Sequence, residues 1–131
     1  MKLKNLKQSV VIKTTPEEIY NALMDSKKHS AFTGDTAKIS KSVGGKFSAY
    51  SGYITGKNIE LVPGKKIVQS WHSSDWEEGV FSKVTFLLRP GKNSTKLGFT
   101  QTGIPSDDYE NVKQGWIDYY WEPMKKMLKK E

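Results

Sequence analysis

The chain has 131 residues, of which 36% are hydrophobic and 11% aromatic, and it contains no cysteine. This length fits a single domain over residues 1–131, and the composition excludes a disordered chain. The lack of cysteine excludes disulfides and thiolate zinc sites. We expect a cytoplasmic protein that does not enter a membrane, because neither a signal peptide nor a run of about 20 apolar residues is present. The net charge of +7 fits an anionic partner or simple solubility.

The first third of the chain predicts a strand followed by two short helices. Val10-Val11-Ile12 is β-branched, which predicts a strand over residues 3–13. Thr15 is a suitable N-cap for a helix with Pro16 at its first position and Glu18 completing a capping box. This helix should end near Ser26, and a second short helix or a turn should cover residues 27–32.

From residue 36 the pattern changes to strands separated by turns. Polar and apolar residues alternate most clearly at Ser82, Val84, Phe86 and Leu88, which share one strand face. One apolar face and one polar face are typical of an antiparallel sheet. The six expected strands lie at residues 36–41, 46–50, 53–62, 65–72, 80–89 and 94–102.

The last segment, residues 106–130, predicts one long helix with Ser106 as its cap. Val112, Trp116, Tyr120 and Met124 recur every four residues and form an apolar stripe. Pro123 has no N–H to bond the carbonyl of Tyr119, so we expect a kink there. The lysines at 125–126 and 129–130 suit the negative end of such a helix. The resulting fold class is α+β, with a curved antiparallel sheet folded around this helix.

Several short motifs carry a resemblance to a known family, and they run in the family's order over nearly the whole chain. They are Ala31-Phe32-Thr33, Gly44-Gly45-Lys46-Phe47, Gly52-Tyr53-Ile54-Thr55-Gly56, Leu61-Val62-Pro63, Ile67-Val68 with Trp71, Thr102-Gly103-Ile104-Pro105, and Gln114-Gly115-Trp116 with Tyr119-Tyr120. With these motifs the chain resembles the C-terminal domain of the activator of the ninety-kilodalton heat-shock chaperone's ATPase, a START-like domain of the SRPBCC superfamily.

This resemblance implies a helix-grip (START/Bet v 1-like) fold: seven antiparallel strands around the C-terminal helix, with two short helices after strand 1. It implies a non-catalytic, co-chaperone-like or stress-related interaction module with a heat-shock chaperone as partner. The family's eukaryotic members also have a separate N-terminal domain, for which this chain has no room. An alternative function is the binding of a small apolar ligand in a cavity between sheet and helix, as in other members of the superfamily. A cyclase-type enzyme is a third alternative.

Large aromatic and amide side chains on the expected inner surfaces are the candidate walls of that cavity. Simple core packing explains the rings equally well, whereas buried amides need partners that a ligand or water can supply. The candidates are Phe47, Gln69, Trp71, Phe86, Phe99, Gln101, Trp116 and Tyr120.

Three further residues need a separate interpretation. Trp76 stands among acidic residues in a predicted hairpin loop, so we expect it to be exposed and a candidate partner contact. His29 lies in a polar run and is expected to be solvent-exposed, and His72 should point away from the Trp71 face. Two isolated histidines have no metal-ligand spacing and no orienting partner. The sequence therefore predicts no catalytic residues, metal or cofactor, and it contains no nucleic-acid-binding motif.

Overall fold

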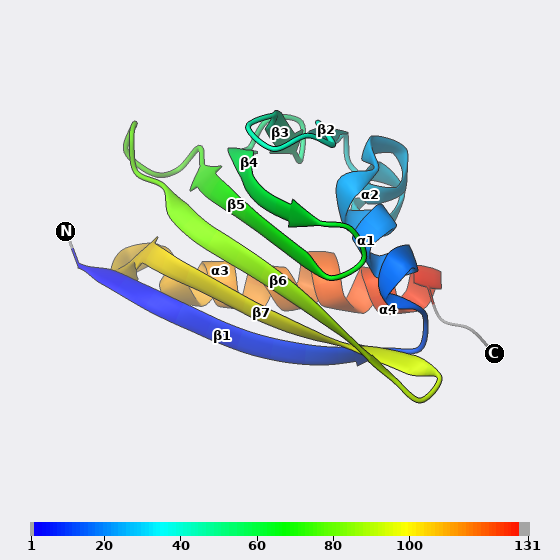
Figure 1. Cartoon of the computed structure of the whole chain (residues 1–131). Helices are drawn as coiled ribbons and strands as arrows, with labels where there is room; N and C mark the ends of the chain where they lie inside the picture. Colours follow the sequence, from blue (N-terminus) through cyan, green and yellow to red (C-terminus); the bar gives the residue numbers. More distant parts are fainter. Residues whose placement is uncertain (1, 129–131) are drawn as a thin grey trace.

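In a computed structural model of the protein, seven antiparallel strands form one curved sheet, and helical segments cover its inner face (Figure 1). The structure describes residues 2–128. The strand order is β1-β7-β6-β5-β4-β3-β2, so β1 and β7, the first and last strands along the chain, are neighbours in the sheet. The strands are β1 (Leu3–Ile12), β2 (Lys38–Ile39), β3 (Lys46–Ala49), β4 (Ile54–Val62), β5 (Lys66–Ser73), β6 (Ser82–Gly91) and β7 (Ser94–Pro105). The helices are α1 (Pro16–Met24), α2 (Ser26–Thr33), η1 (Ser106–Asp108), α3 (Tyr109–Trp116), η2 (Ile117–Trp121) and α4 (Glu122–Leu128).

This arrangement confirms the predicted helix-grip fold. All seven expected strands are present and every neighbouring pair is antiparallel. Helix α1 begins as its sequence predicts: the Thr15 hydroxyl accepts a hydrogen bond from the Glu18 amide at 3.3 Å, and Pro16 is the first helical residue. Helices α1 and α2 lie at the end of the sheet where α4 also ends (Figure 1).

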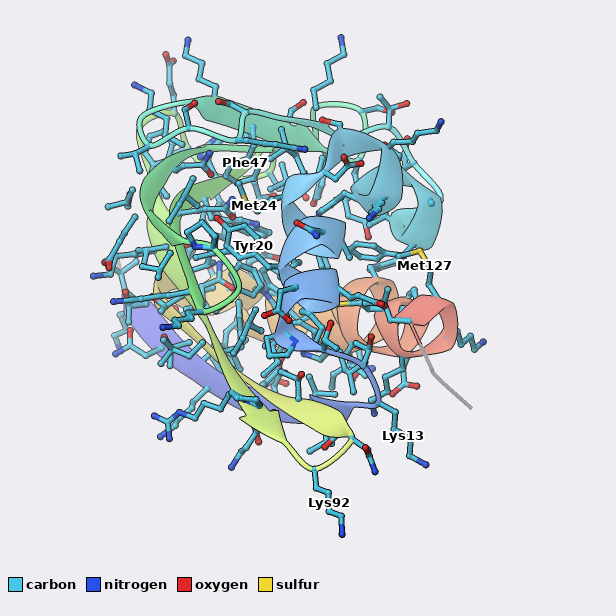
Figure 2. All side chains as sticks on the ribbon, turned by 45° about the vertical axis from the view of Figure 1, so that its right-hand side comes forward. Lys13, Tyr20, Met24, Phe47, Lys92 and Met127 are labelled. Carbon is cyan, nitrogen blue, oxygen red and sulfur yellow. The ribbon has the colours of Figure 1, made fainter. Side chains whose placement is uncertain are left out.

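The core lies between the sheet and the helices because the strand faces differ in polarity. On β6, Val84 and Phe86 are buried, whereas Lys83 and Arg89 are exposed on the outer face. Figure 2 shows the same division elsewhere: the lysines at 13 and 92 project outward, while Met24 and Phe47 are buried in the interior. The alternating pattern therefore fixes which face of the sheet meets the helices.

The C-terminal helix differs from expectation at both its start and its middle. Ser106 is not an N-cap; it opens a 3₁₀ turn, and α3 begins at Tyr109 without a side-chain cap. Residues Ile117–Trp121 form a π-helical segment that ends two residues before Pro123. As expected, the Tyr119 carbonyl receives no hydrogen bond from Pro123; it accepts one from the Tyr50 hydroxyl at 3.1 Å. Lys129 and Lys130, and with them the predicted end of the helix, lie outside the described residues.

We expect Tyr50→Phe to lower the free energy of unfolding by about 1 kcal/mol, because the Tyr119 carbonyl loses this donor. Tyr119→Phe is the matched control: its hydroxyl makes no hydrogen bond within residues 2–128 and its side chain is exposed. Urea denaturation of both variants checks the difference. A loss of equal size in the two variants would show that the bond from Tyr50 contributes nothing specific.

Candidate functional site

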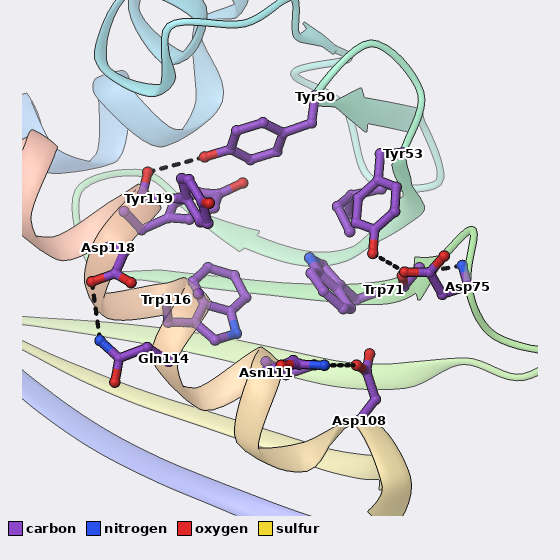
Figure 3. Close-up of a pocket in the computed structure, with 15 residues that line it drawn as sticks. Tyr50, Tyr53, Trp71, Asp75, Asp108, Asn111, Gln114, Trp116, Asp118 and Tyr119 are labelled. Carbon is purple, nitrogen blue, oxygen red and sulfur yellow. Dashed lines mark hydrogen bonds between the residues drawn. The ribbon is translucent and has the colours of Figure 1, made fainter.

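An open groove of about 610 Å³ lies between the C-terminal helix and the ends of β4 and β5 (Figure 3). We call it the aromatic groove, because six of its fifteen lining residues are tyrosine or tryptophan. Trp71 from β5 and Trp116 from α3 meet in it, with ring centroids 5.7 Å apart. The lining residues are Tyr50, Tyr53, Ile54, Trp71, Ser73, Asp75, Asp108, Asn111, Val112, Gln114, Gly115, Trp116, Asp118, Tyr119 and Tyr120.

Three carboxylates line the groove, and neutral side chains donate hydrogen bonds to all of them. Tyr53 donates its hydroxyl hydrogen to Asp75, which raises the pKa of the Tyr53 hydroxyl. Gln114 donates to Asp118 at 3.0 Å, and Asn111 donates to Asp108 at 3.2 Å (Figure 3). Among residues 2–128, no lysine, arginine or histidine lines the groove. The groove therefore combines apolar rings with negative charge.

Of the eight predicted cavity residues, six line one or both of two spaces in the structure, and Phe99 and Gln101 line neither. Trp71, Trp116 and Tyr120 line the aromatic groove. Together with Phe47, Gln69 and Phe86 they also surround a small interior void of about 10 Å³. A void of this size has room for about one water molecule. The groove and the void lie side by side, separated by the side chains of Trp71, Trp116 and Tyr120, which line both.

Close ring packing explains why so little space remains under the helix. The rings of Phe99 and Trp116 have centroids 4.4 Å apart, and those of Phe86 and Phe99 are 5.2 Å apart. Trp121 stacks on Trp116 at 5.5 Å with an interplanar angle of 22°. Sequence reasoning missed Trp121, because a residue five positions after Trp116 falls off an α-helical stripe. The π-helical segment, with its i→i+5 hydrogen bonds, brings it back to the same side.

The two buried glutamines have protein partners. Trp116 Nε1 donates to Gln101 Oε1 at 2.8 Å, and Gln101 Nε2 donates to the Ser82 hydroxyl at 2.8 Å. Gln69 Nε2 donates to Asn58 Oδ1 at 2.9 Å. These bonds tie the helix to β7 and β6, and β5 to β4. Both amides therefore have a structural explanation, and a role in orienting a ligand remains a prediction.

Trp76 is buried, so the expectation of an exposed ring was wrong. Only 8% of the residue is exposed. Its Nε1 donates to Asp108 at 2.7 Å, and its ring lies 5.4 Å from that of Trp71. The loop after β5 folds back onto the start of the C-terminal helix, which covers the ring. Its role as a partner contact stays a prediction, now for a side chain that is mostly covered.

His29 is also buried, contrary to expectation, at 4% exposure. Helix α2 points its lysines outward and turns His29 inward with Phe32, three residues later; the two ring centroids are 4.9 Å apart. Tyr120 contacts it from the C-terminal helix at 5.3 Å. Its Nδ1 has no hydrogen-bond partner among residues 2–128, and burial lowers the pKa of the imidazole to about 4. Phe32, three positions later, is the one apolar neighbour in the sequence that could have suggested this face, but the polar residues around His29 led to the prediction of exposure.

His72 behaves differently, since it lies on the outer face, as expected from its place after Trp71. It is partly exposed, and its Nδ1 lies 2.6 Å from the Val80 carbonyl. Within residues 2–128, no group of histidine, aspartate and glutamate side chains could hold a metal ion. Over the same part of the chain, no helix combines the length and apolar character that a membrane crossing requires.

The fold and this groove define a helix-grip domain with an open groove lined by aromatic rings. The chain belongs to the family described as Activator of Hsp90 ATPase homolog 1-like protein, whose model matches residues 13–129. This confirms the resemblance found in the sequence motifs.

Individual relatives agree with this assignment. The chain is 40% identical over 114 residues to the Activator of 90 kDa heat shock protein ATPase homolog of Dictyostelium discoideum, covering 86% of this chain and 30% of that protein. It is 36% identical over 112 residues to homolog 1 of Homo sapiens, covering 86% and 33%. It therefore spans about a third of the length of these relatives. The solved structure of an HSP90 activator from Plasmodium falciparum is 31% identical, with a TM-score of 0.88 over 95% of each chain.

Proposed function

We propose that this chain is a non-catalytic, co-chaperone-like module of the cytoplasm that binds a heat-shock chaperone of the Hsp90 type. The observation that carries the proposal is the family membership. Curated relatives with 36–40% identity over 86% of this chain are named as homologs of activators of that chaperone's ATPase. Further support comes from the solved structure of an HSP90 activator from Plasmodium falciparum, because the match covers 95% of this chain and 95% of that chain.

The outer face of the sheet offers a surface for such a partner. Lys83 and Arg89 on β6 and Lys96 on β7 all point away from the core and are exposed. Arg89 and Lys96 are directly paired across the strands. Lys7 on β1 extends this basic face. A surface of one charge sign speeds the association of an oppositely charged partner, so we infer an acidic contact surface on the chaperone.

Binding to the cognate chaperone is therefore expected to weaken as salt rises above physiological strength, where exposed charges are screened over about 8 Å. Affinity measured by calorimetry between 0.1 and 0.5 M salt, together with the chaperone's ATPase rate, checks this. Complete absence of binding would remove the co-chaperone function. Salt-insensitive binding would indicate an apolar contact in place of the basic face.

Charge reversal locates the contact. Lys83→Glu with Lys96→Glu should reduce binding, since both positions lie on the basic outer face. Lys27→Glu with Lys28→Glu changes the net charge equally on exposed positions of α2 and serves as the control. Equal loss in both double variants would mean that only net charge matters, and not this face.

Carriage of a small apolar ligand is the second candidate function, and the aromatic groove of about 610 Å³ favours it. Its volume falls within the range of pockets that hold small molecules. Native mass spectrometry of the purified protein tests the idea. A bound small molecule that is released on unfolding would support it, and a uniformly empty protein that also ignores fluorescent apolar probes would not.

A further inference from the structure

The aromatic groove is locally acidic in a chain with a net charge of +7. Within the described part of the chain, its lining contains three aspartates and no cationic side chain. The ion pairs between residues 2 and 128 all lie elsewhere and join Lys41 to Asp25, Lys66 to Glu60 and Lys125 to Glu122. The negative charge of the groove is therefore not neutralised by the described part of the protein.

Neutral side chains donate hydrogen bonds to the carboxylates of Asp108 and Asp118 and leave their negative charge available to a ligand. Asp108 is held by Trp76 Nε1 and Asn111 Nδ2, and Asp118 by Gln114 Nε2. Neutral donors fix the carboxylates in place without cancelling their charge. Each carboxylate oxygen has more than one acceptor site, so a cation can bind in addition to these donors.

The rings beside the carboxylates suit the same kind of ligand. The faces of tryptophan and tyrosine attract ammonium and guanidinium groups, and they also pack against the aliphatic stems that carry them. Tyr119, which is 57% exposed, provides such a ring, whereas Trp71 and Trp116 also line the groove but are only 7% and 3% exposed. Tyr120 lines the groove too, at 7% exposure, and its hydroxyl makes no hydrogen bond within residues 2–128. That hydroxyl is free to bond a peptide group of a ligand.

We propose that the aromatic groove binds an extended peptide segment of a partner protein through two basic side chains, one at Asp108 and one at Asp118. Both aspartates line the groove from the C-terminal helix. They are ten positions apart, which at about 1.5 Å per residue is about 15 Å along the helix. A polyproline-type segment rises about 3.1 Å per residue, so basic residues about five positions apart match this distance. The proposal does not depend on the chaperone as partner.

The probe is the peptide acetyl-Lys-Pro-Pro-Pro-Pro-Lys-amide, whose lysines have this spacing. Added to the purified chain, it should change the tryptophan fluorescence, because Trp71 and Trp116 line the groove. The double variant Asp108→Asn with Asp118→Asn should bind the peptide about tenfold more weakly, since two partly exposed charge contacts are lost. Asp118→Asn alone, at an exposed position, should give a smaller loss in the same direction.

A matched control separates the groove from general charge. Asp107→Asn with Glu110→Gln removes two exposed charges from the same helical region, but neither residue lines the groove. This variant should bind the peptide as the unmodified chain does. If it loses as much affinity as the groove variant, the attraction is non-specific and the proposal is overturned.

Two further peptides test the identity of the occupant. The same peptide with glutamate in place of lysine should not bind. A version with norleucine in place of lysine keeps the aliphatic stems and removes the charge, and it should bind much more weakly. If the norleucine peptide binds as well as the lysine peptide, the groove takes apolar ligands and the proposed recognition of cations fails. Failure here leaves the chaperone measurements untouched, so the two proposals can fail separately.

Discussion

Trp116→Ala is expected to lower the free energy of unfolding by about 3–5 kcal/mol. The residue is only 3% exposed, and its ring lies 4.4 Å from those of both Phe99 and Tyr120. Truncation leaves a void where helix and sheet meet. It also leaves Gln101 Oε1 without the donor that now lies 2.8 Å away. Chemical denaturation with the slope held common to both proteins measures the loss.

Tyr119→Ala is the control for this prediction. It removes a large ring three positions further along the same helix, but the ring is 57% exposed. We expect its cost to stay below about 1 kcal/mol, as for most surface substitutions. If Trp116→Ala costs no more than Tyr119→Ala, the helix does not grip the sheet through this side chain.

Acidification is expected to destabilise the protein by an amount on the order of 3 kcal/mol through His29 alone. Burial lowers the pKa of this imidazole from the ordinary 6.5 to about 4. Between these two values the unfolded chain binds a proton at His29 and the folded chain does not. Stability is therefore fully retained above pH 6.5, falls as the pH drops through this window, and levels off below pH 4.

Other groups respond at lower pH and can be separated from His29. The pKa of Asp25 is lowered from 3.8 by hydrogen bonds from the Lys28 amide, and that of Asp35 by the Ser51 hydroxyl. Because their folded pKa values lie below 3.8, their contribution is present at higher pH and is lost at the acid end of the window and below. The decline between pH 6.5 and about 4.5 thus reports mainly on the histidine.

His29→Leu tests this assignment, since leucine fills a similar volume next to Phe32 and Tyr120 and cannot be protonated. The free energy of unfolding of the variant should change little between pH 6.5 and 4.5, whatever its value at neutral pH. The titration of the His29 ring protons by NMR gives the folded-state pKa directly. A variant whose stability falls with pH as steeply as that of the original chain would assign the effect to other residues.

The order of elements follows from local chemistry that is legible in the sequence. Thr15 and Pro16 place the start of α1, because a cap and a fixed φ angle act within one turn. The alternation through Val84 and Phe86 predicts the buried face of β6, because successive side chains of a strand point to opposite faces. The C-terminal helix was misplaced at its start, where a 3₁₀ turn replaces a capped first turn, and its π-helical middle was not predicted.

The candidate site was only partly predictable. Trp71, Trp116 and Tyr120 were found because apolar rings on inner faces are a pattern in the sequence. Their neighbours in the groove, Asp108 and Asp118, were not singled out, since exposed aspartates in a helix are typical of any solvated surface. What distinguishes them is a groove to which residues 2–128 contribute no cationic lining residue, and that depends on which elements fold together.

The sequence by itself determined the seven strands, the two short helices, the long C-terminal helix and the family, because periodicity, caps and short motifs act over a few residues. Only the tertiary structure decided the burial of Trp76 and His29. The polar residues around each of them do not indicate which ring will pack against it. Trp71 packs against Trp76 from 5 positions away in the sequence, and Tyr120 packs against His29 from 91 positions away. The groove arises in the same way, between elements distant in sequence, where the helix leaves the ends of β4 and β5 uncovered.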